Sequence, residues 1–114
     1  MDVGATMKAR IRESVENAYS KLCDATAKWH KAALAESKAK QDYAKAHLRL
    51  FVDGKIIGKN AEERELSAQA QLTHEDNAVF QAVFAQKLAK AELELAQLKL
   101  SELEVLLAHG FLDD

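Results

Sequence analysis

Glycine, lysine and asparagine gather at residues 54–60, where they resemble a phosphate-binding loop. The segment reads Gly54-Lys55-Ile56-Ile57-Gly58-Lys59-Asn60. A P-loop has four residues between its first glycine and the Gly-Lys pair, followed by a serine or threonine that contacts magnesium. Here three residues intervene and asparagine follows. The spacing favours a turn with a solvated lysine, with a weak anion contact at the following helix N-terminus as the alternative.

The spacing of the histidines in the sequence does not indicate a metal site. None has a second ligand four residues away, and zinc requires about four converging ligands. We expect surface or capping roles for them, with the last one beside the negative end of a helix. The four are His30, His47, His74 and His109.

Neither the cysteine nor the carboxylates form a catalytic constellation. Cys23 is the only cysteine, and its place beside Leu22 within a helix favours packing, because a nucleophile needs a nearby base and a positively polarised setting. Glu92 and Glu94, like Glu102 and Glu104, are two residues apart and diverge around a helix. We therefore expect no catalytic residue, no metal and no cofactor.

The composition indicates long helices. The 114 residues include no proline and four glycines. Alanine, leucine, lysine, glutamate and glutamine predominate, as in long helices and coiled coils. We expect one all-α domain, residues 1–114, whose helices span about 7–52, 61–72 and 74–109, with a connector at 53–60.

The first expected helix carries a continuous apolar repeat, which we call the seam. Steps of four and three residues alternate along it, a 3.5-residue repeat that requires a partner helix. Eleven of its twelve positions are apolar or aromatic; Glu36 is the exception, either setting register or marking a point where the seam turns outward. The positions are Ile11, Val15, Ala18, Leu22, Ala25, Trp29, Ala32, Glu36, Ala39, Tyr43, Ala46 and Leu50.

Turn and cap signals separate the expected helices. Asp53-Gly54 ends the first helix. Asn60 is a suitable N-cap for the short helix, with Glu63 three residues later as in a capping box. Thr73 is expected to be a second N-cap, where the chain either restarts or bends. Gly110 is the expected C′ residue of the last helix.

The last expected helix is apolar on two opposite sides. One side carries Phe80, Phe84, Leu88, Ala91, Leu95, Leu98 and Val105, and the other carries Ala82, Ala89, Leu93, Ala96, Leu100, Leu103 and Leu107. The first helix can cover only one side, and a large exposed apolar patch is unusual in a monomer. We expect an antiparallel helical hairpin, closed within one chain or by swapping, that forms a homodimeric four-helix bundle. The expected oligomer seam is Leu93, Leu100, Leu103 and Leu107.

The connector is the expected contact site for an unidentified protein partner. Ile56 and Ile57 are large β-branched residues between Lys55 and Lys59. They either pack over the end of the bundle or are offered to a partner. Packing is favoured, because exposing adjacent isoleucines is costly.

The charges are divided along the chain. Residues 1–59 contain 12 Lys/Arg and 7 Asp/Glu, whereas residues 60–114 contain 4 and 11. An antiparallel pair would neutralise this difference. Nucleic-acid binding is the alternative, but the lysines and arginines spread around the first helix, and few aromatics are present to stack on bases. No segment suggests a membrane span or a secretion signal, so we expect a cytoplasmic protein.

The segment Gly58-Lys59-Asn60-Ala61-Glu62-Glu63-Arg64 lies between two long Ala-rich helices and resembles a G-K-N-x-x-x-R step. Small helical proteins of phages and prophages carry such a step. The resemblance implies a phage-derived intracellular accessory protein, associated with recombination or replication, and supplies no catalytic residues. Together with the apolar repeats, it leads us to expect a non-catalytic helical scaffold.

Overall fold

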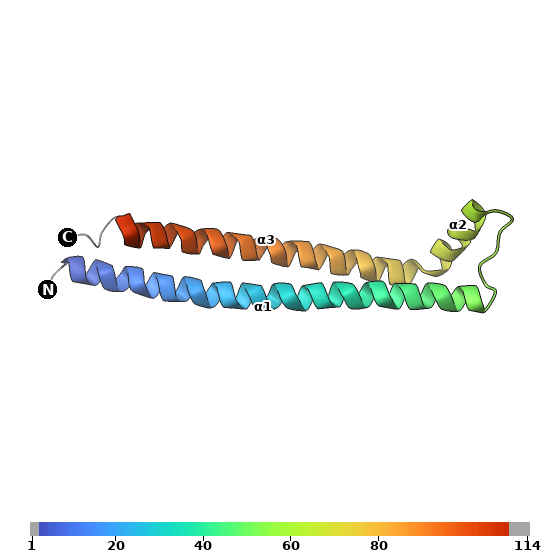
Figure 1. The fold of residues 1–114 in the computed structure, drawn as a ribbon, viewed down its shortest axis with the longest axis horizontal. Coiled ribbons are helices and arrows are strands. Elements are labelled where there is room, and N and C mark those ends of the chain that lie inside the picture. The colour runs from blue at the N-terminus through green and yellow to red at the C-terminus, as the bar shows by residue number, and fades with distance from the viewer. Residues whose placement is uncertain (1–2, 110–114) are drawn as a thin grey trace. The chain divides into compact units, whose positions relative to one another are not determined.

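The computed structural model describes residues 3–109, which form three helices and no strand. They are α1 (Val3–Val52), α2 (Ala61–Gln71) and α3 (Thr73–His109) (Figure 1). The predicted all-α class is therefore confirmed, and the predicted helix boundaries differ only at the ends. The predicted C-cap at Gly110 lies outside the described residues.

The chain divides into two compact units, each containing a length of α1 and a length of α3. The terminal unit is Met1–His30 with Leu88–Asp114, and the connector unit is Lys31–Lys87. In the terminal unit, Tyr19 bonds to Glu104 and Lys28 bonds to Glu92. Residue numbers rise along α1 as they fall along α3, so these two lengths are antiparallel, as predicted.

The predicted seam lies on α1, and all twelve positions of this α1 seam are buried or half-buried. Glu36 is among them: its side chain is 20% exposed, and its Oε1 lies 3.0 Å from Nζ of Lys40. The seam therefore does not turn outward at Glu36. The ion pair with Lys40, four residues further along the helix, compensates the negative charge of the Glu36 carboxylate at this otherwise apolar position.

Alanine recurs every seventh residue at buried or half-buried positions of both long helices. This spacing is two turns of a 3.5-residue repeat, so the alanines stay on one side of each helix. Small side chains at the contact allow two helix axes to approach near the short end of their usual 8–10 Å separation. The alanines are Ala18, Ala25, Ala32, Ala39 and Ala46 on α1, and Ala82, Ala89 and Ala96 on α3.

Each unit has a small apolar core. In the terminal unit, Ala18, Leu100 and Leu103 form a buried cluster against which Val15 and Leu22 pack. In the connector unit, Leu72 is 2% exposed and is buried together with Ala68 of α2. The cluster of the terminal unit joins residues of α1 to residues of α3, so its burial ties these two lengths of helix together.

A glycine C-cap ends α1. Gly54 has φ 69°, the left-handed conformation that glycine adopts without steric cost. Its N–H donates to the carbonyl of Phe51 at 3.1 Å, and the Lys55 N–H donates to the carbonyl of Leu50 at 2.9 Å. This pair of bonds is a Schellman motif. The predicted turn at Asp53-Gly54 is confirmed.

The Gly-Lys-Asn step begins α2. The Asn60 side chain accepts a hydrogen bond from the Glu63 N–H at 2.8 Å, which confirms the predicted N-cap. Glu63 accepts from the N–H of Lys59, one residue before the position in a standard capping box. A Cβ on Gly58 would lie 2.7 Å from the backbone nitrogen of Arg64. Only glycine allows this approach.

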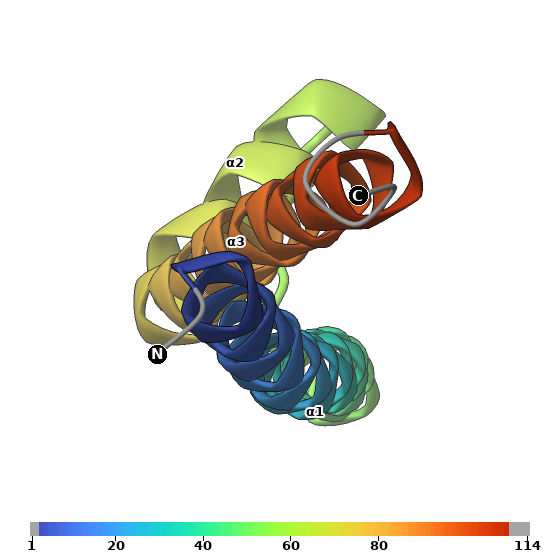
Figure 2. The same ribbon diagram turned by 90° about the vertical axis from the view of Figure 1, so that its left-hand side faces the viewer.

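The prediction that Thr73 is an N-cap is wrong. Thr73 is the first residue of α3, and its hydroxyl donates backward to the carbonyls of Gln69 and Ala70, at 3.4 and 3.2 Å. The N–H of Asp76 donates to the carbonyl of Leu72, so helical bonding resumes at once. The chain bends here, and α2 lies at an angle to the first turns of α3 (Figures 1 and 2).

Candidate interaction surfaces

The two connector isoleucines have different environments. Ile56 is half-buried, whereas Ile57 is 74% exposed. The backbone is held to α2, because the Ile57 N–H donates to Oγ of Ser67 and the Lys55 carbonyl accepts from Nε2 of Gln71 at 2.8 Å. Packing was favoured for both isoleucines, and the structure supports it for Ile56 only.

The other predicted contact residues of the connector, Lys55 and Lys59, are exposed. Their backbones are nevertheless bonded, since the Lys59 N–H donates to Oε2 of Glu63 at 2.8 Å. Sequence reasoning missed Ser67 and Gln71, which bond to this connector. A polar pair four residues apart on one side of a short helix was the available signal.

The predicted oligomer seam packs within the chain. Leu100 and Leu103 are buried, and both belong to the cluster that contains Ala18 of α1. Leu93 and Leu107 are half-buried on the same side of α3. The intrachain contact therefore uses this stripe, which differs from the role we predicted for it. The heptad-spaced alanines explain why this side of α3 packs against α1, because the small side chains of Ala89 and Ala96 permit close approach of the two helices.

The opposite side of α3 is exposed. In the terminal unit it carries an apolar surface that we call the outer stripe. Leu95 is 66% exposed and Leu98 is 62% exposed. The remaining members are exposed as well, and Leu106 was missed by the sequence analysis. The outer stripe consists of Leu88, Ala91, Leu95, Leu98, Val105 and Leu106.

The outer stripe has the spacing of a helix contact. From Leu88 to Val105, steps of three and four residues alternate, with Glu102 as the one polar side chain in the series. This is the 3.5-residue repeat of the α1 seam. A groove of about 510 Å³ runs over the stripe beside Leu98, Val105 and Leu106. In the connector unit, Phe80 and Phe84 are also exposed on α3.

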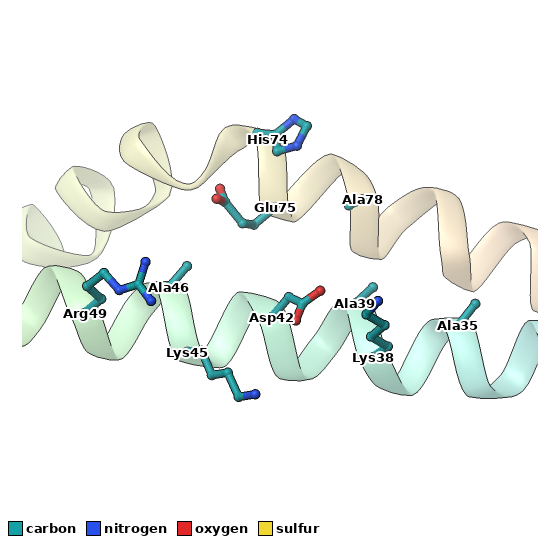
Figure 3. Close-up of a pocket in the computed structure, with 10 residues that line it drawn as sticks. All are labelled: Ala35, Lys38, Ala39, Asp42, Lys45, Ala46, Arg49, His74, Glu75 and Ala78. Atoms are coloured by element: carbon teal, nitrogen blue, oxygen red, sulfur yellow. The ribbon is translucent and has the colours of Figure 1, made fainter.

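The connector unit contains a second groove, of about 570 Å³, between α1 and α3 (Figure 3). Several of the side chains that line this groove are small, among them Ala39, Ala46 and Ala78. Glu75 lies on the side of α3 that faces α1, whereas His74 points away from α1 (Figure 3). The charged lining residues have both signs: Lys38, Asp42, Lys45, Arg49 and Glu75. Lys38 and Lys45, two of the basic residues of α1, therefore line the same groove as two carboxylates.

Polar contacts flank the seam of the terminal unit. The Tyr19 hydroxyl donates to Oε1 of Glu104 at 3.0 Å, and Nζ of Lys28 lies 2.8 Å from Oε2 of Glu92. The hydrogen bond to Glu104, followed by the charge of that carboxylate, raises the pKa of Tyr19 above its ordinary value of 10.0. Both pairs are exposed, so each contributes little to stability.

Cys23 does not have the packing role expected of it, whereas Trp29 does. Cys23 is exposed, so the prediction that it packs is wrong. It lies one residue beyond the seam position of Leu22, and a helix turns about 100° per residue. Trp29 occupies the seam as predicted, but its buried Nε1–H has no hydrogen-bond partner.

The described residues contain no group of three or more histidine, cysteine, aspartate or glutamate side chains that could hold a metal ion. Across residues 3–109, no helical stretch combines the length and apolarity needed to cross a bilayer.

Comparisons with known proteins identify no family for this chain. No protein-family model matches it, and searches of curated proteins and of solved structures returned no match. Function must therefore be argued from the surfaces described above.

Proposed function

We propose that this protein is a non-catalytic helical scaffold that self-associates through the outer stripe of α3. The observation that supports this proposal most directly is the exposure of four large apolar side chains at the spacing of a helix contact: Leu88, Leu95, Leu98 and Val105. Large contiguous apolar patches on soluble proteins mark interaction sites. A second helix laid along the stripe would remove these side chains from water, at about 25 cal/mol per Å² of apolar area.

A second copy of the chain is the occupant we propose. The α1 seam is buried or half-buried within the chain. Among the residues that the structure describes, this leaves the outer stripe as the periodic apolar surface without a partner helix. The two apolar sides of α3 are opposite one another, so a partner would lie across α3 from α1. In the terminal units, the dimer would then place its two α3 helices in the middle and the α1 helices outside.

The accessory role in a phage-derived setting is supported only by the resemblance of Gly58-Lys59-Asn60 and the following turn to the G-K-N-x-x-x-R step. The nucleic-acid alternative gains no support from the connector-unit groove, where Asp42 and Glu75 interrupt the basic residues. We retain it as an outcome of the experiment below. The exposed side chain of Ile57 is a further point at which a different protein could be bound.

The proposal is tested by size-exclusion chromatography with light scattering. We expect wild-type protein to elute with twice the chain mass of 12.6 kDa. The variant Leu95→Glu/Leu98→Glu should elute at the mass of one chain, because charges would be buried in the contact. Gln97→Glu is the control and should remain dimeric, since Gln97 is exposed and lies off the stripe, about 100° around α3 from Leu98. Circular dichroism verifies that each variant stays helical.

A monomeric wild-type protein at concentrations up to about 100 μM, where contacts weaker than about 5–6 kcal/mol remain dissociated, would refute self-association. A dimer unaffected by Leu95→Glu/Leu98→Glu would refute the stripe as the contact. The same column run with a DNA duplex tests the alternative. Co-elution that weakens steeply with salt would replace the scaffold proposal by nucleic-acid binding.

A further inference from the structure

The outer stripe is complementary to itself in one orientation only. Its series in the terminal unit is Leu88, Ala91, Leu95, Leu98, Glu102 and Val105. Reversing this series end for end brings Leu88 opposite Val105, Ala91 opposite Glu102 and Leu95 opposite Leu98. Each large aliphatic residue then faces another, and the single charged residue faces the single small one.

We propose that the α3 helices of two chains pair antiparallel, with the two-fold axis between Leu95 and Leu98. This inference rests on the proposed self-association and specifies its geometry. Such a contact is isologous, because each residue meets its counterpart in both directions. It uses the stripe from Leu88 to Val105 in full, and every layer of the contact recurs on both sides of the axis.

Charge supports this orientation. Glu92 and Lys99 lie on the same flank of α3, one heptad apart. Antiparallel pairing places Glu92 near Lys99 of the second copy, and the reciprocal pair forms on the other side of the axis. The bond between Oε2 of Glu92 and Lys28 leaves the other carboxylate oxygen of Glu92 for this contact. Opposite charges beside a helix contact set the orientation of the partners.

The parallel alternative has a charge conflict. A parallel pair would bring Glu94 near Lys99, which is favourable. It would also place Glu102 directly against Glu102 of the second copy, in the centre of the contact. Two carboxylates in an apolar layer repel each other and lose hydration. In the antiparallel pair, the small side chain of Ala91 leaves Glu102 room to extend its carboxylate to water.

Disulfide crosslinking between differently tagged full-length chains tests the orientation. In a Cys23→Ser background, one chain carries Leu88→Cys and the other Val105→Cys. We expect the mixture to form a crosslinked heterodimer, and each variant alone to crosslink no more than the control Gln97→Cys. A disulfide requires Cα atoms within about 7 Å, which excludes neighbouring registers. A second pair, Leu95→Cys with Leu98→Cys, should behave in the same way.

Each other result overturns the inference. Self-crosslinking of Leu88→Cys alone and of Val105→Cys alone would establish parallel pairing. A dimer by light scattering with no crosslink from either pair would place the contact in another register or on another surface, while the proposed self-association would stand. A monomeric wild-type protein would overturn both, so the two failures are distinguishable.

Discussion

Replacing Leu100 by alanine should destabilise the terminal unit by about 3 kcal/mol. Leu100 is 7% exposed and is packed with Leu103 and Ala18, with Val15 and Leu22 beside them. The substitution removes the equivalent of three methylene groups, or about 2.4 kcal/mol at about 0.8 kcal/mol each. Ala18 is too small to fill the space, so a residual cavity adds to this loss.

The assay is thermal and urea unfolding followed by circular dichroism at one fixed low protein concentration. A loss of about 3 kcal/mol corresponds to a Tm lowered by roughly 10–15 °C in a domain of this size. The matched control is Leu34→Ala, because Leu34 is 72% exposed on α1. It should change stability by less than about 0.5 kcal/mol. Equal effects of the two substitutions would refute our assignment of the buried side of α3.

Other substitutions test the connector and the flanking contacts. Asn60→Ala removes the side chain that caps α2 and should cost about 1 kcal/mol in urea unfolding; no change would show that the cap contributes nothing. Gly58→Ala should cost more than Asn60→Ala, because its Cβ would lie 2.7 Å from the backbone nitrogen of Arg64; a smaller cost would contradict that close approach. In a Tyr43→Phe background, absorbance titration should find the pKa of Tyr19 above 10.0, and Glu104→Gln should lower it. Because folding raises the pKa of Tyr19, the stabilising contribution of its neutral hydroxyl is complete below pH 10 and is lost as pH rises through the folded-state pKa. If Glu104→Gln leaves the pKa of Tyr19 unchanged, the hydrogen bond to Glu104 does not cause the raised pKa.

The α1 seam could be predicted from sequence because only one side of that helix carries a continuous apolar repeat. Position by position, the 3.5-residue repeat from Ile11 to Leu50 is buried or half-buried in the structure. The helix caps could also be predicted, because they depend on residues close in sequence. Asn60 and Gly54 act through bonds to residues within five positions, so their residue types alone were sufficient.

The sides of α3 could not be assigned in the same way. Both carry leucines at helical spacing, so hydrophobicity alone does not distinguish Leu95 from Leu100. The distinction comes from the alanines, since Ala89 and Ala96 accompany Leu100 on the side that approaches α1. Alanine recurs on α1 at the same seven-residue interval, and comparing the two helices would have identified the side that packs.

Two local predictions failed, each for a different reason. The Thr73 hydroxyl bonds to the carbonyls of the preceding turn, which threonine can do within a helix as readily as it can cap one. Cys23 is adjacent to the seam in sequence but not in space. The different environments of Ile56 and Ile57 depended on how Ser67 and Gln71 hold the connector, which no local pattern specifies.

Thiol accessibility on the outer stripe tests the central proposal most directly. In the Cys23→Ser background, the rate of reaction with a thiol reagent is measured for Leu98→Cys and for Gln97→Cys, at low and at high protein concentration. If the stripe is covered by a second copy, Leu98→Cys should react rapidly in dilute solution and become protected as concentration rises, whereas Gln97→Cys should react equally fast in both. Rates for Leu98→Cys that do not change with concentration would contradict self-association through this surface.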